Sequence, residues 1–130
     1  MDVWRDAMDL VVLVYALCAS LPDSERFALS QQLRKAAVSV PSNIAEGAAR
    51  RSTLEYLRFL AVARGSLAEL DTQLELARRL FQLNPSPELK QTLNRTYIRL
   101  NAQIRALEAR IAEDPEDYSL AGCESRIPNP

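Results

Sequence analysis

Residues 24–52, SERFALSQQLRKAAVSVPSNIAEGAARRS, decide the fold of this chain. Along this stretch an apolar residue recurs at steps of three and four, which is the spacing of one face of an α-helix. The members of this face are Leu29, Leu33, Ala37, Val40, Ile44 and Ala48. The face keeps its phase across Pro41, although a proline inside a helix costs about 3 kcal/mol. We therefore predict one long helix, ending near residue 50 and kinked at Pro41, in preference to a loop over residues 39–43 with Asn43 capping a new helix.

The segment before this stretch predicts a first helix over about residues 2–20, followed by a turn at residues 21–23. Its apolar residues form two adjacent stripes: Val3, Ala7, Leu10, Val14 and Leu17 in one, and Trp4, Met8, Val11, Tyr15 and Cys18 in the other. Together the two stripes make a wider face than a single core contact needs. Two interpretations remain open: the helix is central and well buried, or its second stripe packs against another subunit.

The segment after it predicts two more helices. Residues 52–55, Ser-Thr-Leu-Glu, form a capping box that begins the third helix, and Ser86 followed by Pro87 is a typical start for the fourth. The third helix carries an apolar seam of heptad spacing made of Tyr56, Leu60, Ala63, Leu67, Leu70, Leu74, Ala77 and Phe81. Beside it runs a row of Leu57, Arg64, Asp71 and Arg78. This row is interpreted either as a solvated flank or as a polar seam facing another subunit.

Four amphipathic helices joined by short turns predict an all-α fold, an antiparallel up-down-up-down four-helix bundle over residues 1–114. Residues 115–130 are acidic and rich in turn-forming residues, so we expect a poorly ordered C-terminal tail. The acidic N-terminus does not resemble a signal peptide. The apolar run from Leu10 to Leu21 is shorter than the roughly 20 residues that a bilayer requires. The expected location is the cytoplasm, with no membrane partner.

The composition argues against catalysis. The chain has no histidine, which removes the commonest general base and the commonest metal ligand in proteins. The two cysteines, Cys18 and Cys123, stand far apart in different contexts and match no metal or redox motif. We therefore predict that the protein is not an enzyme and holds no cofactor or metal.

Two groups of residues are candidates for a functional site. The first is a polar knot of Ser39, Ser42, Asn43 and Glu46, which share one side of the helix near Pro41. It either satisfies the backbone groups that Pro41 leaves free and ties the helix to a neighbour, or lines a ligand pocket. The second is a set of cations: Arg34, Lys35, Arg50, Arg51 and Arg58. These lie within residues 26–64, which carry a net charge of +5 and could bind phosphates or simply form a solvated face.

The segment ERFALSQQLRKAAVSVPSNIAEGAARRS (residues 25–52), together with FLAVARGSLAELDTQLELA (residues 59–77), resembles a known family. It is similar to the four-helix bundle proteins encoded in intervening sequences of bacterial 23S ribosomal RNA genes, also described as S23 ribosomal protein-like. The resemblance extends over about residues 3–112. Related bundles include the accessory proteins of diversity-generating retroelements, which form homopentamers and bind nucleic acid. The resemblance thus implies a bacterial four-helix bundle, a homopentamer, with no catalytic residues and a biochemical role that is not settled.

The sequence leaves two functions open. In the first, a homo-oligomeric bundle binds RNA or DNA without sequence preference through the five candidate cations, because phosphate contacts position a nucleic acid but do not specify it. In the second, the oligomer is a structural scaffold or adaptor that binds a protein partner and no nucleic acid.

Overall fold

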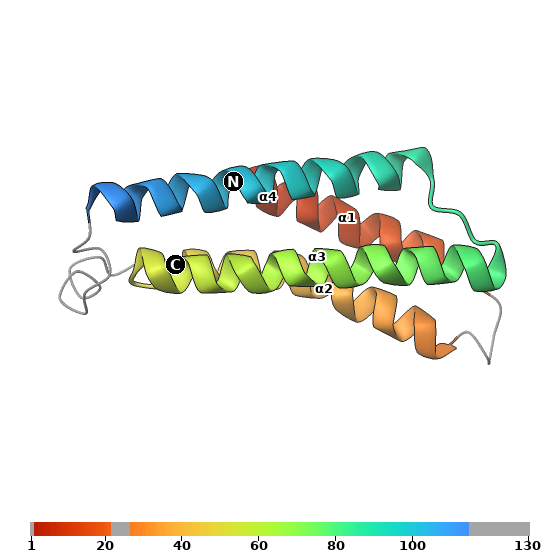
Figure 1. Cartoon of the computed structure of the whole chain (residues 1–130). Helices are drawn as coiled ribbons and strands as arrows, with labels where there is room; N and C mark the ends of the chain where they lie inside the picture. Colours follow the sequence, from red (N-terminus) through yellow and green to blue (C-terminus); the bar gives the residue numbers. More distant parts are fainter. Residues whose placement is uncertain (1, 22–26, 115–130) are drawn as a thin grey trace.

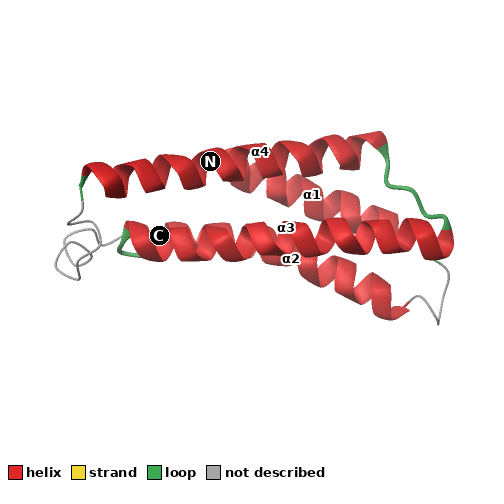
Figure 2. Cartoon of the chain, in the orientation of Figure 1, coloured by secondary structure: helices red, strands yellow, loops and turns green. Residues whose placement is uncertain are grey.

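The computed structural model describes residues 2–21 and 27–114, which form four helices (Figure 1): α1 (Asp2–Cys18), α2 (Phe27–Ala48), α3 (Thr53–Phe81) and α4 (Pro87–Glu113). Figure 2 shows helices and connecting loops, and no strand occurs within these described ranges. The predicted all-α, four-helix fold is confirmed. The expected start of the second helix near Ser24 and the expected acidic tail at 115–130 lie outside the described residues.

Each helix packs mainly against two others, so the four form a closed ring in the order α1, α2, α3, α4. Contacts between neighbouring helices show that they run antiparallel, because residue numbers rise along one helix as they fall along the other. Between α2 and α3, for example, Gly47 lies against Phe59 while Ser39 bonds Ser66. Figure 1 shows the same course, because the colour gradient reverses direction from each helix to the next. The arrangement agrees with the up-down-up-down order that the sequence predicts.

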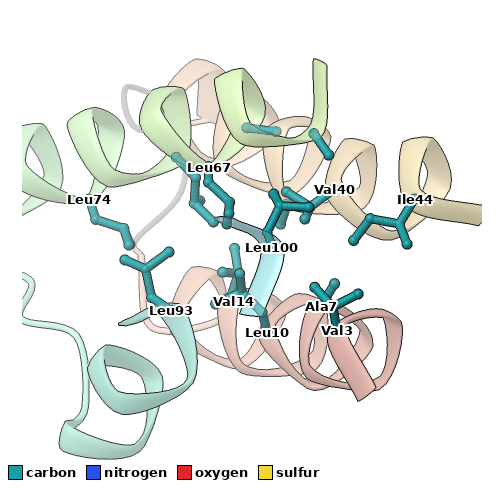
Figure 3. Packing of buried hydrophobic residues seen from close by; sticks show 14 of the residues in the cluster. Val3, Ala7, Leu10, Val14, Val40, Ile44, Leu67, Leu74, Leu93 and Leu100 are labelled. Atoms are coloured by element: carbon teal, nitrogen blue, oxygen red, sulfur yellow. The ribbon is translucent and has the colours of Figure 1, made fainter. Parts of the chain in front are cut away.

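The core runs along the centre of the bundle and is almost entirely aliphatic (Figure 3). The predicted apolar faces supply it: the first stripe of α1, the α2 face and the α3 seam are buried over most of their length. Buried members that the sequence analysis did not single out include Leu89, Thr92 and Thr96 on α4. Burial of each large aliphatic side chain of the core contributes about 1.5–3 kcal/mol, which makes the core the main source of stability.

Pro41 lies inside α2, which continues without a break from Phe27 to Ala48. The prediction of one helix through the proline is therefore confirmed, and the bend at Pro41 stays a prediction. Pro41 is itself buried, and its neighbours Val40 and Ile44 are fully buried. Burial of these two residues is large enough to offset the roughly 3 kcal/mol that the missing backbone donor and the ring clash cost.

The helix ends follow the predicted capping signals where these exist. The Ser52 hydroxyl accepts from the Glu55 backbone N–H at 3.1 Å, and the Ser86 hydroxyl accepts from the Leu89 N–H at 3.1 Å. Ser52 has extended backbone, with φ −121°. A helix must have ended before such a residue, and α2 accordingly stops at Ala48. The first two helices end one or two residues earlier than expected, at Cys18 and Ala48.

Candidate functional site

The polar knot divides into two parts in the folded chain. The Asn43 side-chain amide donates to the Ser39 carbonyl at 2.7 Å and to the Ser39 hydroxyl at 3.0 Å. The Ser39 hydroxyl is 2.7 Å from the hydroxyl of Ser66 on α3, with either oxygen able to donate. The contact between Ser39 and Ser66 ties α2 to α3 at a half-buried position, and the Asn43 bonds hold the Ser39 side of it within α2. Ser42 is exposed, and Glu46 turns instead to Arg50.

The knot does not replace the backbone bond that Pro41 removes. In a helix the missing N–H of residue 41 would donate to the carbonyl of residue 37. The Asn43 amide bonds the Ser39 carbonyl, two residues further along. The expected compensation is therefore not made by this amide. The Ser39 hydroxyl instead joins α2 to α3 through Ser66, and Asn43 bonds Ser39 within α2.

Arg50 is held by two contacts within the chain. Its guanidinium lies 2.8 Å from the Glu46 carboxylate, one helical turn earlier, and 4.6 Å from the centroid of the Phe59 ring on α3. Exposed i,i+4 pairs of this kind contribute only about 0.3–0.5 kcal/mol, so the ion pair does not prevent Arg50 from meeting a phosphate. The contact with Phe59 adds a packing role at the α2–α3 corner.

The other candidate cations lie in two places. Arg34 is half-buried against α1, with its guanidinium 5.7 Å from the Tyr15 ring. Lys35 is exposed on α2, while Arg51 and Arg58 are exposed at and just after the α2–α3 turn. Residues 34 and 50 are 16 positions apart, about 24 Å along a helix axis. The structure therefore does not gather the five cations into one cluster.

An exposed apolar surface covers the outer side of α1 and the adjoining edge of α2. Four of its members lie on α1, and their exposed fractions are 36% for Trp4, 42% for Met8, 68% for Val12 and 48% for Tyr15. Val38 on α2 adds a fifth. We call these five residues the α1–α2 face. It contains most of the predicted second stripe, whereas Cys18 from that stripe is buried and Val11 is half-buried.

A buried acid joins α1 to α4. Asp6 is only 5% exposed and accepts from Arg95 at 3.0 Å and from Arg99 at 2.7 Å. The two arginine side chains are 44% and 45% exposed, so their charge also reaches solvent. The sequence analysis assigned no role to these three residues. Arg95 and Arg99 are four positions apart and therefore share one side of α4. This spacing is the one feature of the sequence that could have indicated a paired site for an acid.

The charged row of α3 borders α4 of the same chain. Arg64 donates to the Asn101 side chain at 3.2 Å, and Arg78 pairs with Glu75 at 2.7 Å. Arg78 and Arg79 hold the pKa of Glu75 at about 2, well below its usual range. Burial, with a smaller effect from Asp71, raises the pKa of Tyr97 on α4. Within a single chain, this row of α3 is therefore a partly solvated flank with ion pairs, as in the first of its two interpretations.

The described residues contain no group of three His, Cys, Asp or Glu side chains that could hold a metal ion. An open cleft of about 470 Å³ lies between the end of α3 and the start of α4, with Leu74, Leu89 and Leu93 among its lining residues. None of the helices described here is long and apolar enough to cross a membrane.

Comparison with known proteins places this bundle in a family. The family of 23S rRNA-intervening sequence proteins matches residues 1–113, which is nearly all of the part that the structure describes. No curated protein matches the chain. The match extends over all four helices, including the α2 segment through Pro41 that carries the sequence resemblance. The chain therefore belongs to the 23S rRNA-intervening sequence protein family.

Proposed function

We propose that this protein is a non-enzymatic bundle that assembles with copies of itself through the α1–α2 face. The observation that carries the proposal is the gathering of exposed apolar side chains. Nine large apolar residues of the described chain are exposed, and five of them make up this one face. A patch rich in aromatic residues and methionine, with an arginine at its edge, has the composition of a protein interface.

Assembly explains why the first helix carries two apolar stripes. One stripe fills the core of the bundle, and three of the five residues of the other, Trp4, Met8 and Tyr15, remain at the surface of a single chain. Trp4 and Tyr15 are large, rigid side chains of the type that dominates binding energy at interfaces. Arg34 packs on Tyr15 and covers part of its ring. A homopentamer is the assembly that the resemblance to retroelement accessory proteins implies.

Light scattering at micromolar concentration should report several times the chain mass of 14.6 kDa. Met8→Glu places a charge in the middle of the face and should shift the protein to monomer without unfolding it, because residue 8 is already solvent-exposed. Ile98→Glu is the matched control, since Ile98 is a similarly exposed apolar residue on α4, and this variant should keep the wild-type mass. A monomeric wild-type protein would overturn the proposal.

A second candidate function, non-specific binding of RNA or DNA, is favoured by one observation. Lys35, Arg51 and Arg58 are exposed and make no ion pair with another residue of the described chain. Arg51 and Arg58 are close in sequence around the α2–α3 turn, where a phosphate backbone could meet both. Repetition of this weak site around an oligomer would raise affinity through avidity, provided that one strand reaches several subunits.

The salt dependence of binding checks this second function. Affinity for a single-stranded RNA should fall steeply with salt, and replacing Arg51 and Arg58 together with alanine should weaken binding and reduce the slope of log K against log salt by about 1.4, at roughly 0.7 per lost phosphate contact. Arg79→Ala is the control, since Arg79 is an exposed arginine at the other end of α3 that is paired with Glu75. Absence of RNA retention at low salt would leave the scaffold function alone.

A further inference from the structure

The open cleft between the last turns of α3 and the first turns of α4 is a surface that neither proposed function uses. Its volume of about 470 Å³ is within the usual range for sites that bind small molecules, and such sites are common between the helices of bundles. Its lining residues belong to α3, to α4 and to the linker between them, and none belongs to the α1–α2 face. The cleft is therefore separate from the surface that we assign to self-assembly.

The base of the cleft is apolar. Leu74, Leu89 and Leu93 form it and are at most 8% exposed, and Leu74 and Leu93 point toward each other from α3 and α4 (Figure 3). Half-buried Pro85 and Tyr97 line the cleft as well. An apolar side chain that entered the cleft would leave water for contact with these residues, which favours binding.

The two ends of the cleft carry opposite charges. Asp71 on α3 lies near Tyr97 on α4, and burial together with this carboxylate raises the pKa of that tyrosine. Because α3 and α4 are antiparallel, Arg78 and Lys90 lie together at the other end, nearer to the linker. Each is seven residues from its counterpart at the anionic end. Seven helical residues span about 10 Å, so the anionic and cationic ends are about 10 Å apart along the helices.

The cationic end has positive charge that the chain itself does not neutralise. Glu75 also lines the cleft, but Arg78 and Arg79 both pair with it, so these three residues together keep one positive charge. Lys90 is exposed and makes no ion pair with another described residue, and the same is true of Asp71 at the other end. A ligand that matches both ends would carry a cation and an anion separated by an apolar body.

We propose that this cleft binds a short apolar peptide with free ends, whose amino group meets Asp71 and whose carboxylate meets Lys90. An extended chain covers at most about 3.5 Å per residue, so three residues match the spacing of the two ends. In an extended chain the first and third side chains point to the same side, here toward the leucines of the base. Asn94 lines the cleft between Lys90 and Tyr97 and offers the peptide backbone both a donor and an acceptor.

Titration with the tripeptide Leu-Ala-Leu, followed by NMR of the leucine methyl groups, tests this proposal. The free peptide should shift the methyl signals of Leu74, Leu89 and Leu93 at millimolar concentration. Acetylation of the peptide amino group should weaken binding to the wild-type protein about two- to fivefold, the range for an ion pair at a protein surface, and should not affect binding to Asp71→Asn. Amidation of the peptide carboxylate should weaken wild-type binding similarly and should not affect binding to Lys90→Gln.

Two charge-matched variants are the controls. Glu69→Gln removes an exposed acid of α3 and Arg105→Gln an exposed cation of α4, and neither residue lines the cleft, so both variants should respond to peptide capping as the wild type does. The proposal is wrong if the leucine methyl signals do not shift, or if capping either end leaves the affinity for the wild-type protein unchanged. It is equally wrong if decanoate, which has a carboxylate but no amino group, binds as tightly as the peptide.

Discussion

Replacing Arg95 and Arg99 together with methionine should lower the free energy of unfolding by about 3 kcal/mol, the lower end of the range for breaking a buried ion pair. The reason lies in Asp6, whose carboxylate would stay buried between α1 and α4 without either of its cations. The lower end applies because both arginine side chains are nearly half exposed, so water already shares in solvating the cluster.

Denaturant unfolding followed by circular dichroism measures this loss as a reduced midpoint. Arg105→Met is the control, because Arg105 is an exposed arginine of α4 that makes no ion pair with another described residue, and it should change stability by less than about 0.5 kcal/mol. Adding Asp6→Leu to the double variant should recover much of the lost stability, since it removes the unpaired charge. A double variant as stable as wild type would show that the cluster contributes nothing to folding.

The sequence predicted the helices well because the signals for them are local. The spacing of apolar residues on both sides of Pro41 identified one continuous α2, and the cap residues Ser52 and Ser86 located the starts of α3 and α4. Each of these features depends on residues within one or two helical turns of each other. The two ends without such a cap signal, at Cys18 and Ala48, are the ones that were predicted slightly too late.

The candidate site was predicted less well because its contacts join different helices. Arg50 was identified as a cation, but the Phe59 ring beneath it belongs to α3 and follows from the packing of α2 on that helix. In the same way the polar knot was identified as a group, yet Ser66, the residue of α3 that bonds the Ser39 hydroxyl, lies 27 residues from Ser39 in the sequence. Asp6 has no local sequence signal for burial, because the two arginines that pair with it belong to α4.

Gly47 is a further residue whose role follows only from the packing of α2 on α3. A Cβ atom at this position would lie 2.7 Å from the Phe59 Cβ, 3.0 Å from Tyr56 Cδ1 and 3.2 Å from the Tyr56 carbonyl oxygen. Gly47→Ala should therefore lower the free energy of unfolding, because strain of this kind costs about 1–3 kcal/mol and exceeds the roughly 0.5–1 kcal/mol that alanine contributes in a helix interior. The Phe59 Cβ and the Tyr56 carbonyl are fixed to the α3 backbone and can yield only if the two helices separate.

Gly65→Ala is the matched control and should have the opposite sign. Gly65 lies inside α3, and no atom comes within 4 Å of a Cβ built on it. Its replacement should raise the free energy of unfolding by about 0.5–1 kcal/mol through the lower conformational entropy of the unfolded chain. Since both variants change that entropy alike, the difference between their denaturation midpoints isolates the contact at Gly47. Equal stabilisation by the two substitutions would mean that α2 and α3 do not approach each other this closely in solution.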